Sequence, residues 1–344
     1  MQGLIEYSDD VTGVIAVTDS GRSTGAVRNF LRVPAPGDLR NAMVTLSRAD
    51  PLLRDLFQHR IISQRLNEFN GVAFGNLFIG ALAQMTGSFE RAVLETNRIL
   101  EPAGRILPVT LTSTHLCAEL VDGTLRYEEV SVRGLDKPSI QRVFLRDEEV
   151  EVYPGVVEAI KSADVITFGP GSLFTTVVAS LLVKGVREAI AEARERGART
   201  VYICNTTTQP GQTDGFTAYD HVAEVASYLG ADLLDYALIN TGVPSEAALD
   251  RFRHSGLLLL AVTPEEVRKI TSLGVQVVAG GMIEQGSDER VLWDKQDAIR
   301  HDPAAVAREL VEVFNQPRPQ AAPAEEQSST ETPQTAPHLG WSRT

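Results

Sequence analysis

Short apolar runs alternate with segments of helical periodicity through most of the chain. Five of these runs are apolar at nearly every position and rich in β-branched residues, which is typical of parallel strands buried on both faces. They cover residues 13–18, 164–168, 200–204, 236–240 and 275–279. The alternation predicts an α/β fold in which a doubly wound, mostly parallel sheet carries helices on both faces.

Apolar residues three or four positions apart mark the helices between these strands. One predicted helix has its stripe at Val222, Val225, Ala226 and Leu229, and another has it at Val306, Leu310 and Phe314. We expect each stripe to face the core.

Residues 105–152 show a different pattern, which predicts a small antiparallel β insert. Its expected strands are 107–112, 116–120 and 124–130, and Asp122-Gly123 is typical of a hairpin turn. After residue 315 the composition changes to Pro, Gln, Ser, Thr, Ala and Glu. The sequence therefore predicts one α/β domain over residues 1–315, which contains the insert, and a disordered tail over residues 316–344.

Charge and composition narrow the classes of partner. The 344 residues carry a formal net charge of −13, which repels nucleic acid and anionic membranes, so neither is an expected partner. A small anion remains compatible, because salt screens the net field within about 10 Å. No apolar run of about 18 residues predicts membrane insertion, and residues 1–6 lack the basic and apolar regions expected of a signal peptide. Together with only two cysteines, Cys117 and Cys204, these features favour the cytoplasm.

A glycine-rich turn follows the predicted strand at 164–168. Gly169, Gly171 and Ser172 lie between that strand and a helix. Glycines allow close backbone approach, and free N–H groups at the start of a helix attract anions. The turn therefore predicts a phosphate site, and an ordinary strand-to-helix joint is the alternative.

The loop after the first predicted strand is also dense in polar groups. Loops at the carboxyl ends of parallel strands are where α/β proteins bind ligands. Asp19 can accept from a sugar hydroxyl or hold a metal-bound water, and donors to phosphate follow it at Gly21, Arg22, Ser23 and Thr24. The alternative is an ordinary polar turn.

Two predicted helix starts add further candidates. Asp38 is expected to cap a helix whose apolar face is Leu39, Ala42, Met43 and Leu46. Arg40 and Asn41 lie in the first turn of that helix, where a basic residue opposes the helix dipole, and an anionic ligand would explain the placement. Gly75 and Asn76 lie near the start of another helix, where they either allow close backbone approach or only cap.

Residues 205–215 form the most polar connection in the chain, directly after the predicted strand at 200–204. Candidate groups for contact with a base or sugar are Asn205, Thr208, Gln209, Thr213 and Asp214. A loop that hydrogen-bonds mainly to itself is the alternative.

Established catalytic patterns are missing from the sequence. It contains no nucleophile elbow, no Walker A lysine and no His-Glu-x-x-His motif, so no catalytic residue and no metal site is predicted. The strand that follows the glycine turn ends in Asn205 instead of an acid, which argues against an NAD-dependent dehydrogenase.

Taken together, these segments resemble the YvcK family of bacterial gluconeogenesis factors, also called the CofD-like or UPF0052 family. The resemblance covers nearly all of residues 1–315. It rests on residues 36–41, 74–77, 169–175 and 204–216, and on Arg300-His301-Asp302. It implies a Rossmann-like fold and binding of UDP-N-acetylglucosamine or a related UDP-sugar. It also implies a role in cell shape and peptidoglycan supply during gluconeogenic growth, with a protein partner in cell-envelope regulation.

The related CofD branch transfers a phospholactyl-type group from a nucleotide-activated donor to a flavin-like acceptor. A transferase of that kind, with Mg²⁺ at Asp19 and Asp38, is the alternative to a UDP-sugar-binding regulator without cofactor. A scaffold that recruits partners through its tail is a third interpretation. Arg300 is a candidate charge partner for the ligand, and the sequence leaves a homo-oligomer open.

Three departures from the family pattern bear on these alternatives. Family members carry a second Asp where this chain has Ser20, which weakens a metal or general-base role. Val72-Ala73 replaces a His-Ser pair, and Phe252 stands where a tyrosine is expected, although it can still stack on a base. Family members also begin with a further strand and a glycine-rich loop, so we expect the native chain to start upstream of Met1.

Overall fold

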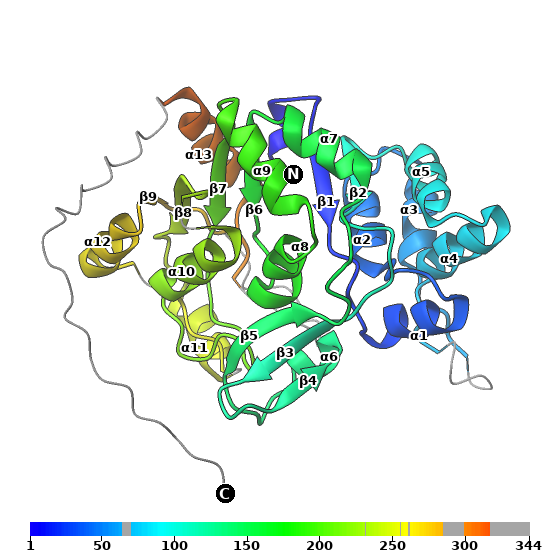
Figure 1. Cartoon of the computed structure of the whole chain (residues 1–344), viewed down its shortest axis with the longest axis horizontal. Helices are drawn as coiled ribbons and strands as arrows, with labels where there is room; N and C mark the ends of the chain where they lie inside the picture. The colour runs from blue at the N-terminus through cyan, green and yellow to red at the C-terminus, as the bar shows by residue number, and fades with distance from the viewer. Residues whose placement is uncertain (64–69, 231, 255, 261, 285–298, 317–344) are drawn as a thin grey trace, which may run out of the picture.

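The computed structural model describes residues 1–63, 70–230, 232–254, 256–260, 262–284 and 299–316. Parallel strands lie near the middle of the molecule, and helices surround them (Figure 1). The predicted tail lies outside the described residues apart from Gln316. Within the described ranges, no helix has the length and apolar character needed to cross a membrane.

The chain alternates strands and helices, as expected. The strands are β1 (Thr12–Ile15), β2 (Arg105–Pro108), β3 (Leu116–Leu120), β4 (Leu125–Tyr127), β5 (Ile140–Leu145), β6 (Val165–Phe168), β7 (Arg199–Ile203), β8 (Tyr236–Asn240) and β9 (Gln276–Gly280). The first helices are α1 (Arg22–Leu31), α2 (Gly37–Thr45), α3 (Pro51–Gln58), α4 (Phe74–Thr86), α5 (Phe89–Leu100), α6 (Glu129–Val132) and α7 (Pro154–Ser162). The others are α8 (Ala179–Leu181), α9 (Val186–Glu195), α10 (Ala218–Leu229), α11 (Glu246–His254), α12 (Pro264–Ser272) and α13 (Pro303–Asn315), with a 3₁₀ turn at Leu4–Glu6 and a π-helix at Leu173–Val178.

The expected parallel strands are present and confirm the α/β fold. Four of them form one sheet in the order β6-β7-β8-β9, and β1 pairs in parallel with β2. All five residues of β8 are buried, because helices cover both faces of a central parallel strand. β1 ends at Ile15, before the predicted end at residue 18, although Ala16 and Val17 remain buried.

The antiparallel insert is confirmed in part. Its sheet has the order β4-β3-β5, and β5 was not predicted. The predicted strand 107–112 was assigned to the wrong sheet, because β2 runs parallel to β1 with Leu107 opposite Val14. An apolar run does not reveal the direction of its partner strand. The predicted strand 124–130 divides into β4 and α6, because Glu128 has a φ of 70° and turns the chain out of the strand.

The predicted helix stripes are buried with one exception. Val222, Val225, Ala226 and Leu229 all face the core from α10, and Val306 and Leu310 do so from α13. The assignment of Phe314 to that second stripe was wrong, because its side chain is 45% exposed and Val313 is buried instead. Phe314 lies in the last turn of α13, and the guanidinium of Arg199 lies over its ring, 5.3 Å from the centroid.

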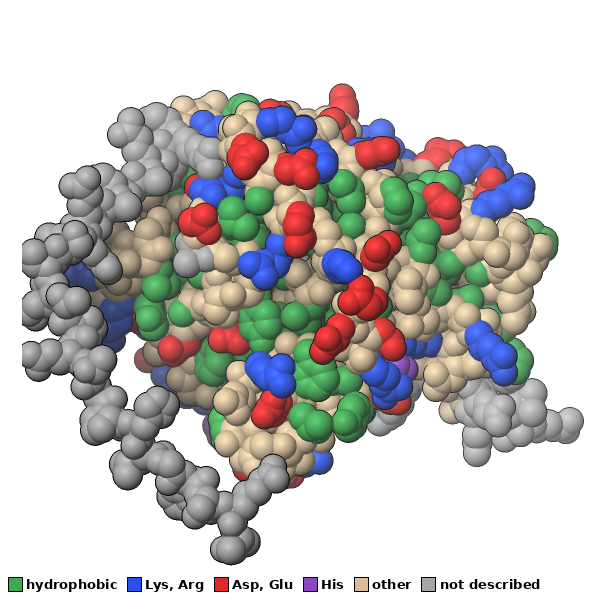
Figure 2. All heavy atoms as spheres, viewed as in Figure 1, with side chains coloured by type: hydrophobic (Ala, Val, Ile, Leu, Met, Phe, Trp, Pro, Cys, Tyr) green, Lys and Arg blue, Asp and Glu red, His purple; other side chains and the backbone are tan. Residues whose placement is uncertain are grey.

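Charged side chains of both signs are distributed over the surface. On the face in Figure 2, described Lys and Arg side chains alternate with Asp and Glu and form no continuous basic area. This face therefore has the mixed surface of a protein that is not built to follow a polyanion.

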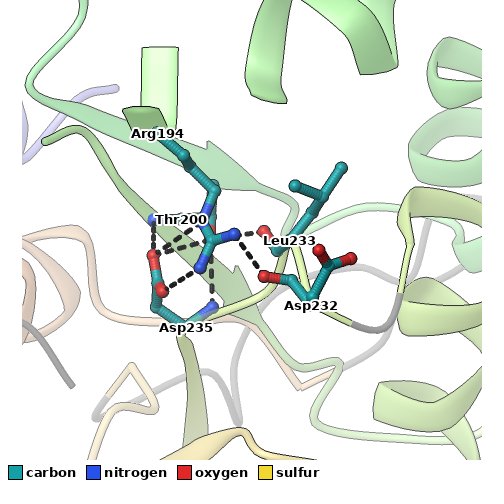
Figure 3. Close-up of polar contacts among 5 residues, drawn as sticks. All are labelled: Arg194, Thr200, Asp232, Leu233 and Asp235. Atoms are coloured by element: carbon teal, nitrogen blue, oxygen red, sulfur yellow. Dashed lines mark hydrogen bonds and ion pairs between the residues drawn. The ribbon is translucent and has the colours of Figure 1, made fainter. Parts of the chain in front are cut away.

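A buried polar network joins the amino-terminal ends of β7 and β8 (Figure 3). The Asp235 carboxylate is 4% exposed; its Oδ1 lies 2.6 Å from Nη2 of Arg194, and its Oδ2 accepts from the backbone N–H of Thr200 at 2.9 Å. Arg194 also donates to the carbonyl of Asp232, and the Thr200 hydroxyl lies 2.7 Å from the carbonyl oxygen of Leu233. The network fixes the entry to β8 at the end of the sheet opposite the loops that follow β7 and β8.

Candidate functional site

The candidate site residues lie mainly in loops that follow the carboxyl ends of the parallel strands. In Figure 1 the arrowheads of β1 and β7 point toward the side of the molecule that carries the β3–β5 sheet. The loop after β1 and the loop after β7 both contact residues 129–137, which we call the bridging segment. Ser20 donates its backbone N–H to Glu129 Oε2 at 3.2 Å, and Lys137 Nζ lies 2.5 Å from the carbonyl oxygen of Gly211.

The bridging segment contacts the loop after β7 closely. A Cβ atom on Gly211 would lie 2.5 Å from the carbonyl oxygen of Gly134, and the φ of Gly211 is +77°. A side chain is therefore excluded at this position on both counts. The bridging segment therefore connects the loop after β1 with the loop after β7, which are about 190 residues apart in the sequence.

Ser23, a predicted site residue in the first turn of α1, contacts the start of α4. Ser23 Oγ accepts from the backbone N–H of Ala73 at 2.9 Å and from Asn76 Nδ2 at 3.2 Å. Asn76 is 1% exposed, and its Oδ1 has no hydrogen-bond partner within the described residues. Buried amide oxygens are normally paired, so this oxygen is available to a ligand hydroxyl or amide.

Glycines bring the surrounding backbone close to these groups. A Cβ on Gly37 would lie 2.2 Å from Thr24 Oγ1 and 3.3 Å from Asp19 Oδ2. A Cβ on Gly75 would lie 2.7 Å from Cδ of Arg40. Thr24 and Asp19 therefore lie beside Gly37, Arg40 lies beside Gly75, and the charge of Asp19 also acts on Arg40.

Arg40 is a buried cation with incomplete hydrogen bonding. Its residue is 4% exposed, and Nη2 donates to Asn41 Oδ1 at 2.6 Å. In the part of the chain that the structure describes, Nε and Nη1 are buried and have no hydrogen-bond partner. Burial, followed by the charge of Arg60, lowers the pKa of Arg40 to about 10, while Asp38 and Asp19 oppose that change. The guanidinium thus stays charged at pH 7 with two unused donors.

Glu129 is a site residue that the sequence did not reveal. Its side chain comes from α6, 109 residues after Ser20, and it accepts from Arg133 Nη1 at 3.0 Å. Burial raises the pKa of Glu129 to about 7, and a hydrogen bond to Asp19 and the charge of Asp19 act in the same direction. The two carboxyl groups therefore share a proton near neutral pH.

We expect Glu129→Gln to remove a pH-dependent loss of stability. Because the folded-state pKa lies above the ordinary value of 4.5, the contribution of Glu129 is fully present below about pH 4.5 and is lost as the pH rises through about 7. Glutamine imitates the protonated acid. The variant should match the wild type at pH 4 and exceed it at pH 8.5 by about 1–3 kcal/mol in urea unfolding.

The exposed Glu148→Gln serves as the control and should follow the wild type at both pH values. A Glu129→Gln variant that is less stable than the wild type at pH 8.5 would contradict the shared proton.

The glycine turn after β6 is linked to the loop after β7. Ser172 Oγ donates to Gln212 Oε1 at 2.9 Å, and Asn205 Nδ2 donates to the carbonyl oxygen of Gly171 at 2.8 Å. Gly169 has a φ of +81°, and a Cβ there would lie 2.9 Å from the carbonyl oxygen of Ile203. The turn thus has the backbone geometry that the sequence predicted, while Ser172 and Asn205 already have protein partners. A phosphate site at this turn stays a prediction.

Most polar groups of residues 205–215 hydrogen-bond within the protein. Thr213 Oγ1 accepts from Gln209 N at 2.8 Å, and Asp214 Oδ2 accepts from Gly211 N at 2.7 Å. Thr208 Oγ1 accepts from Leu258 N at 3.0 Å. The contacts of Thr213 and Asp214 agree with the alternative of a self-bonded loop, while Thr208 bonds to a residue outside the loop. Gln209 differs, because its buried Oε1 has no partner among the described residues.

Of the other predicted residues, one lies in the first turn of α2, two are exposed, and two have side chains that the structure does not describe. Asp38 was wrongly expected to cap α2: Pro36 is the N-cap, and Asp38 lies in the first turn, where its charge still favours the dipole. Asn41 and Arg300 are exposed. Arg22 is the first residue of α1, and Phe252 lies in α11. The side chains of both are outside the described part of the structure.

His301 is a second residue whose role the sequence did not show. Burial lowers its pKa to about 4, against a hydrogen bond to the backbone of Cys204 that acts in the opposite direction. Its Nε2 is buried and has no partner among the described residues. The neutral ring therefore lies directly beside the end of β7, where the polar loop begins.

The described residues hold no group of three or more His, Cys, Asp or Glu side chains arranged for a metal ion. The structure thus defines an α/β protein whose polar groups, with a buried and incompletely paired arginine, gather at the carboxyl ends of parallel strands.

Comparison with known proteins places this architecture in a family. Residues 1–283 match the family model described as 2-phospho-L-lactate transferase CofD. The gluconeogenesis factor of Bacillus subtilis is 34% identical over 317 residues, which cover 92% of this chain and 94% of that protein. The gluconeogenesis factor of Halalkalibacterium halodurans is 36% identical over 312 residues, or 91% of each chain.

A solved structure agrees with these relatives. The crystal structure of a UPF0052 family member from Bacillus halodurans, at 2.60 Å resolution, superposes with a TM-score of 0.81 and 34% identity, and the match covers 90% of this chain and 93% of that chain. This chain belongs to the CofD family, and proteins named gluconeogenesis factors are among its relatives. The family resemblance inferred from the sequence is confirmed.

Proposed function

We propose that this protein is a gluconeogenesis factor that binds a UDP-sugar of the UDP-N-acetylglucosamine type. In this proposal it acts in the cytoplasm as a binding regulator of cell shape and peptidoglycan supply, through a protein partner, and it catalyses no reaction. The names of its relatives support the assignment as a gluconeogenesis factor. The geometry of the candidate site supports an anionic, hydroxyl-rich ligand.

The observation that carries the proposal is the environment of Arg40. A buried guanidinium with two unused donors is costly unless an acceptor completes it. A diphosphate supplies such acceptors, and Arg binds phosphate with paired donors. Beside it, Asp19 and Asn76 offer oxygens to sugar or base groups.

A thermal-unfolding experiment tests this proposal. We expect UDP-N-acetylglucosamine or UDP-glucose at about 100 times its dissociation constant to stabilise the protein by about 2.7 kcal/mol, without a requirement for Mg²⁺. The measurement compares the unfolding midpoint with each UDP-sugar, GTP and NAD(P)H, with and without Mg²⁺. Stabilisation by none of the UDP-sugars would contradict the proposal.

A CofD-type transferase is the second candidate, and the pairing of Asp19 with Glu129 favours it. Two adjacent carboxyl groups with a shared proton are suited to general acid–base chemistry or to a divalent cation. In that case GTP with Mg²⁺, and not a UDP-sugar alone, should raise the unfolding midpoint. The same experiment therefore separates the two candidates.

A further inference from the structure

A second group of cationic side chains includes Arg28 of α1, and the charge of Asp19 acts on Arg28 as well as on Arg40. Arg28 in α1 is 4% exposed. Its Nε donates to Ser113 Oγ at 3.1 Å, and its Nη2 donates to the carbonyl of Thr114. The remaining nitrogen, Nη1, is buried and has no hydrogen-bond partner among the described residues. A fixed guanidinium therefore presents an unused donor.

His115 lies beside this donor, because it follows the two residues to which Arg28 bonds. Its side chain is half-buried, and Nδ1 is buried without a partner in the described part of the chain. The backbone of His115 is held by Arg146, whose N–H donates to the His115 carbonyl at 2.9 Å. The Arg146 guanidinium lies over the ring of Tyr127, 5.8 Å from its centroid. Arg28 thus comes from α1, His115 from the residue before β3 and Arg146 from the residue after β5.

The nearby acidic side chains do not hydrogen-bond to Arg28 Nη1 or His115 Nδ1 among the described residues. Asp147 accepts from the Thr114 hydroxyl at 3.1 Å, and the charges of Glu128, Asp19 and Asp147 act on Arg28. Two buried nitrogens without partners in one cluster indicate a missing acceptor, because buried polar groups are normally hydrogen-bonded. A compact oxyanion has several acceptor oxygens and suits donors that converge from different sides.

We propose that Arg28, His115 and Arg146 form a second binding subsite, which takes a small oxyanion: phosphate or the phosphoryl group of a small metabolite. The subsite uses cationic residues other than Arg40, although the charge of Asp19 acts on both Arg28 and Arg40. Through it the protein responds to the level of a phosphorylated compound in addition to the ligand at the strand ends.

His115 gives this subsite a pH dependence. Burial and the charges of Arg28 and Arg146 lower the pKa of His115, while Glu128 and Asp147 oppose the change. A bound dianion favours the imidazolium, so binding takes up a proton and tightens as the pH falls. Sulfate is the suitable probe, because its charge is constant between pH 5 and pH 8.

The test is calorimetric titration of the full chain with sulfate at pH 5.5 and pH 8. We expect saturable binding that is tighter at pH 5.5, a loss of at least tenfold in Arg28→Met, and a loss of the pH dependence in His115→Gln. Arg142→Met removes a charge from the exposed pair with Glu119 and should bind sulfate like the wild type. Arg40→Met should also keep sulfate binding, while Arg28→Met should keep UDP-N-acetylglucosamine binding within about twofold.

Three results would overturn the subsite: no saturable sulfate binding, equal binding by wild type and Arg28→Met, or an unchanged pH dependence in His115→Gln. If Arg28→Met does not fold, His115→Gln decides alone. Titration with inorganic phosphate and with glycerol 3-phosphate then shows whether the free ion or a carried phosphoryl group binds better. Because the proposed function is tested with UDP-N-acetylglucosamine and the subsite with sulfate, a failure of the proposed function is recognised separately.

Discussion

Replacing Arg40 by Met should strongly weaken UDP-sugar binding without destabilising the ligand-free protein. The wild-type guanidinium is buried, and two of its nitrogens lack hydrogen-bond partners among the described residues. Removing a buried charge that is poorly compensated is neutral or stabilising when an apolar side chain of similar volume replaces it. Ligand binding should weaken at least about 30-fold, because the loss of one partner from a buried charge pair costs about 2 kcal/mol or more.

The measurement combines thermal unfolding without ligand and calorimetric titration with UDP-N-acetylglucosamine. Arg48→Met is the matched control, since Arg48 is exposed just beyond α2 and should change neither quantity. A variant with an unchanged dissociation constant and a lower unfolding midpoint would mean that Arg40 has a structural role only.

Replacing Arg194 by Met should lower the free energy of unfolding by about 3–5 kcal/mol. The substitution leaves the Asp235 carboxylate buried without its cationic partner, which is one of the costliest single changes in a protein interior. The backbone N–H and hydroxyl of Thr200 still donate to Asp235, and they hold the charge in place without balancing it. The midpoint of urea unfolding reports the loss.

Arg98→Met provides the comparison. It breaks an ion pair with Glu95 in which the arginine is 75% exposed, and such pairs contribute about 0–1 kcal/mol. Equal effects of the two substitutions would show that the Asp235 network does not stabilise the sheet. UDP-sugar binding by folded Arg194→Met should be unchanged, because the network lies at the opposite end of β7 from the candidate site.

The hydrophobic pattern was sufficient for those strands that are buried on both faces. The prediction for β8 is correct to the residue, since every side chain of that strand is in the core. The pattern failed for β2, because Leu107 is equally apolar beside a parallel or an antiparallel partner. The pairing of β2 depends on β1, about 90 residues earlier, and the sequence around β2 does not indicate which strand will be its partner.

A candidate site residue could be predicted from the sequence where its charge is unfavourable for the local secondary structure. Arg40 was recognised from its placement in the first turn of a helix, which opposes the dipole. Glu129 was not, because nothing in its own segment marks it and only the folded chain brings it to Ser20. Thr213 and Asp214 accept from backbone N–H groups, and their predicted ligand role stays a prediction, because polar loop residues look the same in sequence whether they bind a ligand or their own backbone.

The bridging segment restricts how this protein can be shortened. The β3–β5 sheet lies at one side of the molecule, so it is an obvious segment to delete when a minimal domain is designed (Figure 1). Deleting residues 116–145 would also remove Glu129, Gly134 and Lys137, which contact the loop after β1 and the loop after β7. A trimmed chain would keep its parallel sheets and lose the part that holds the two loops in register. Any minimal version must therefore retain the insert or replace it with another crosslink between those loops.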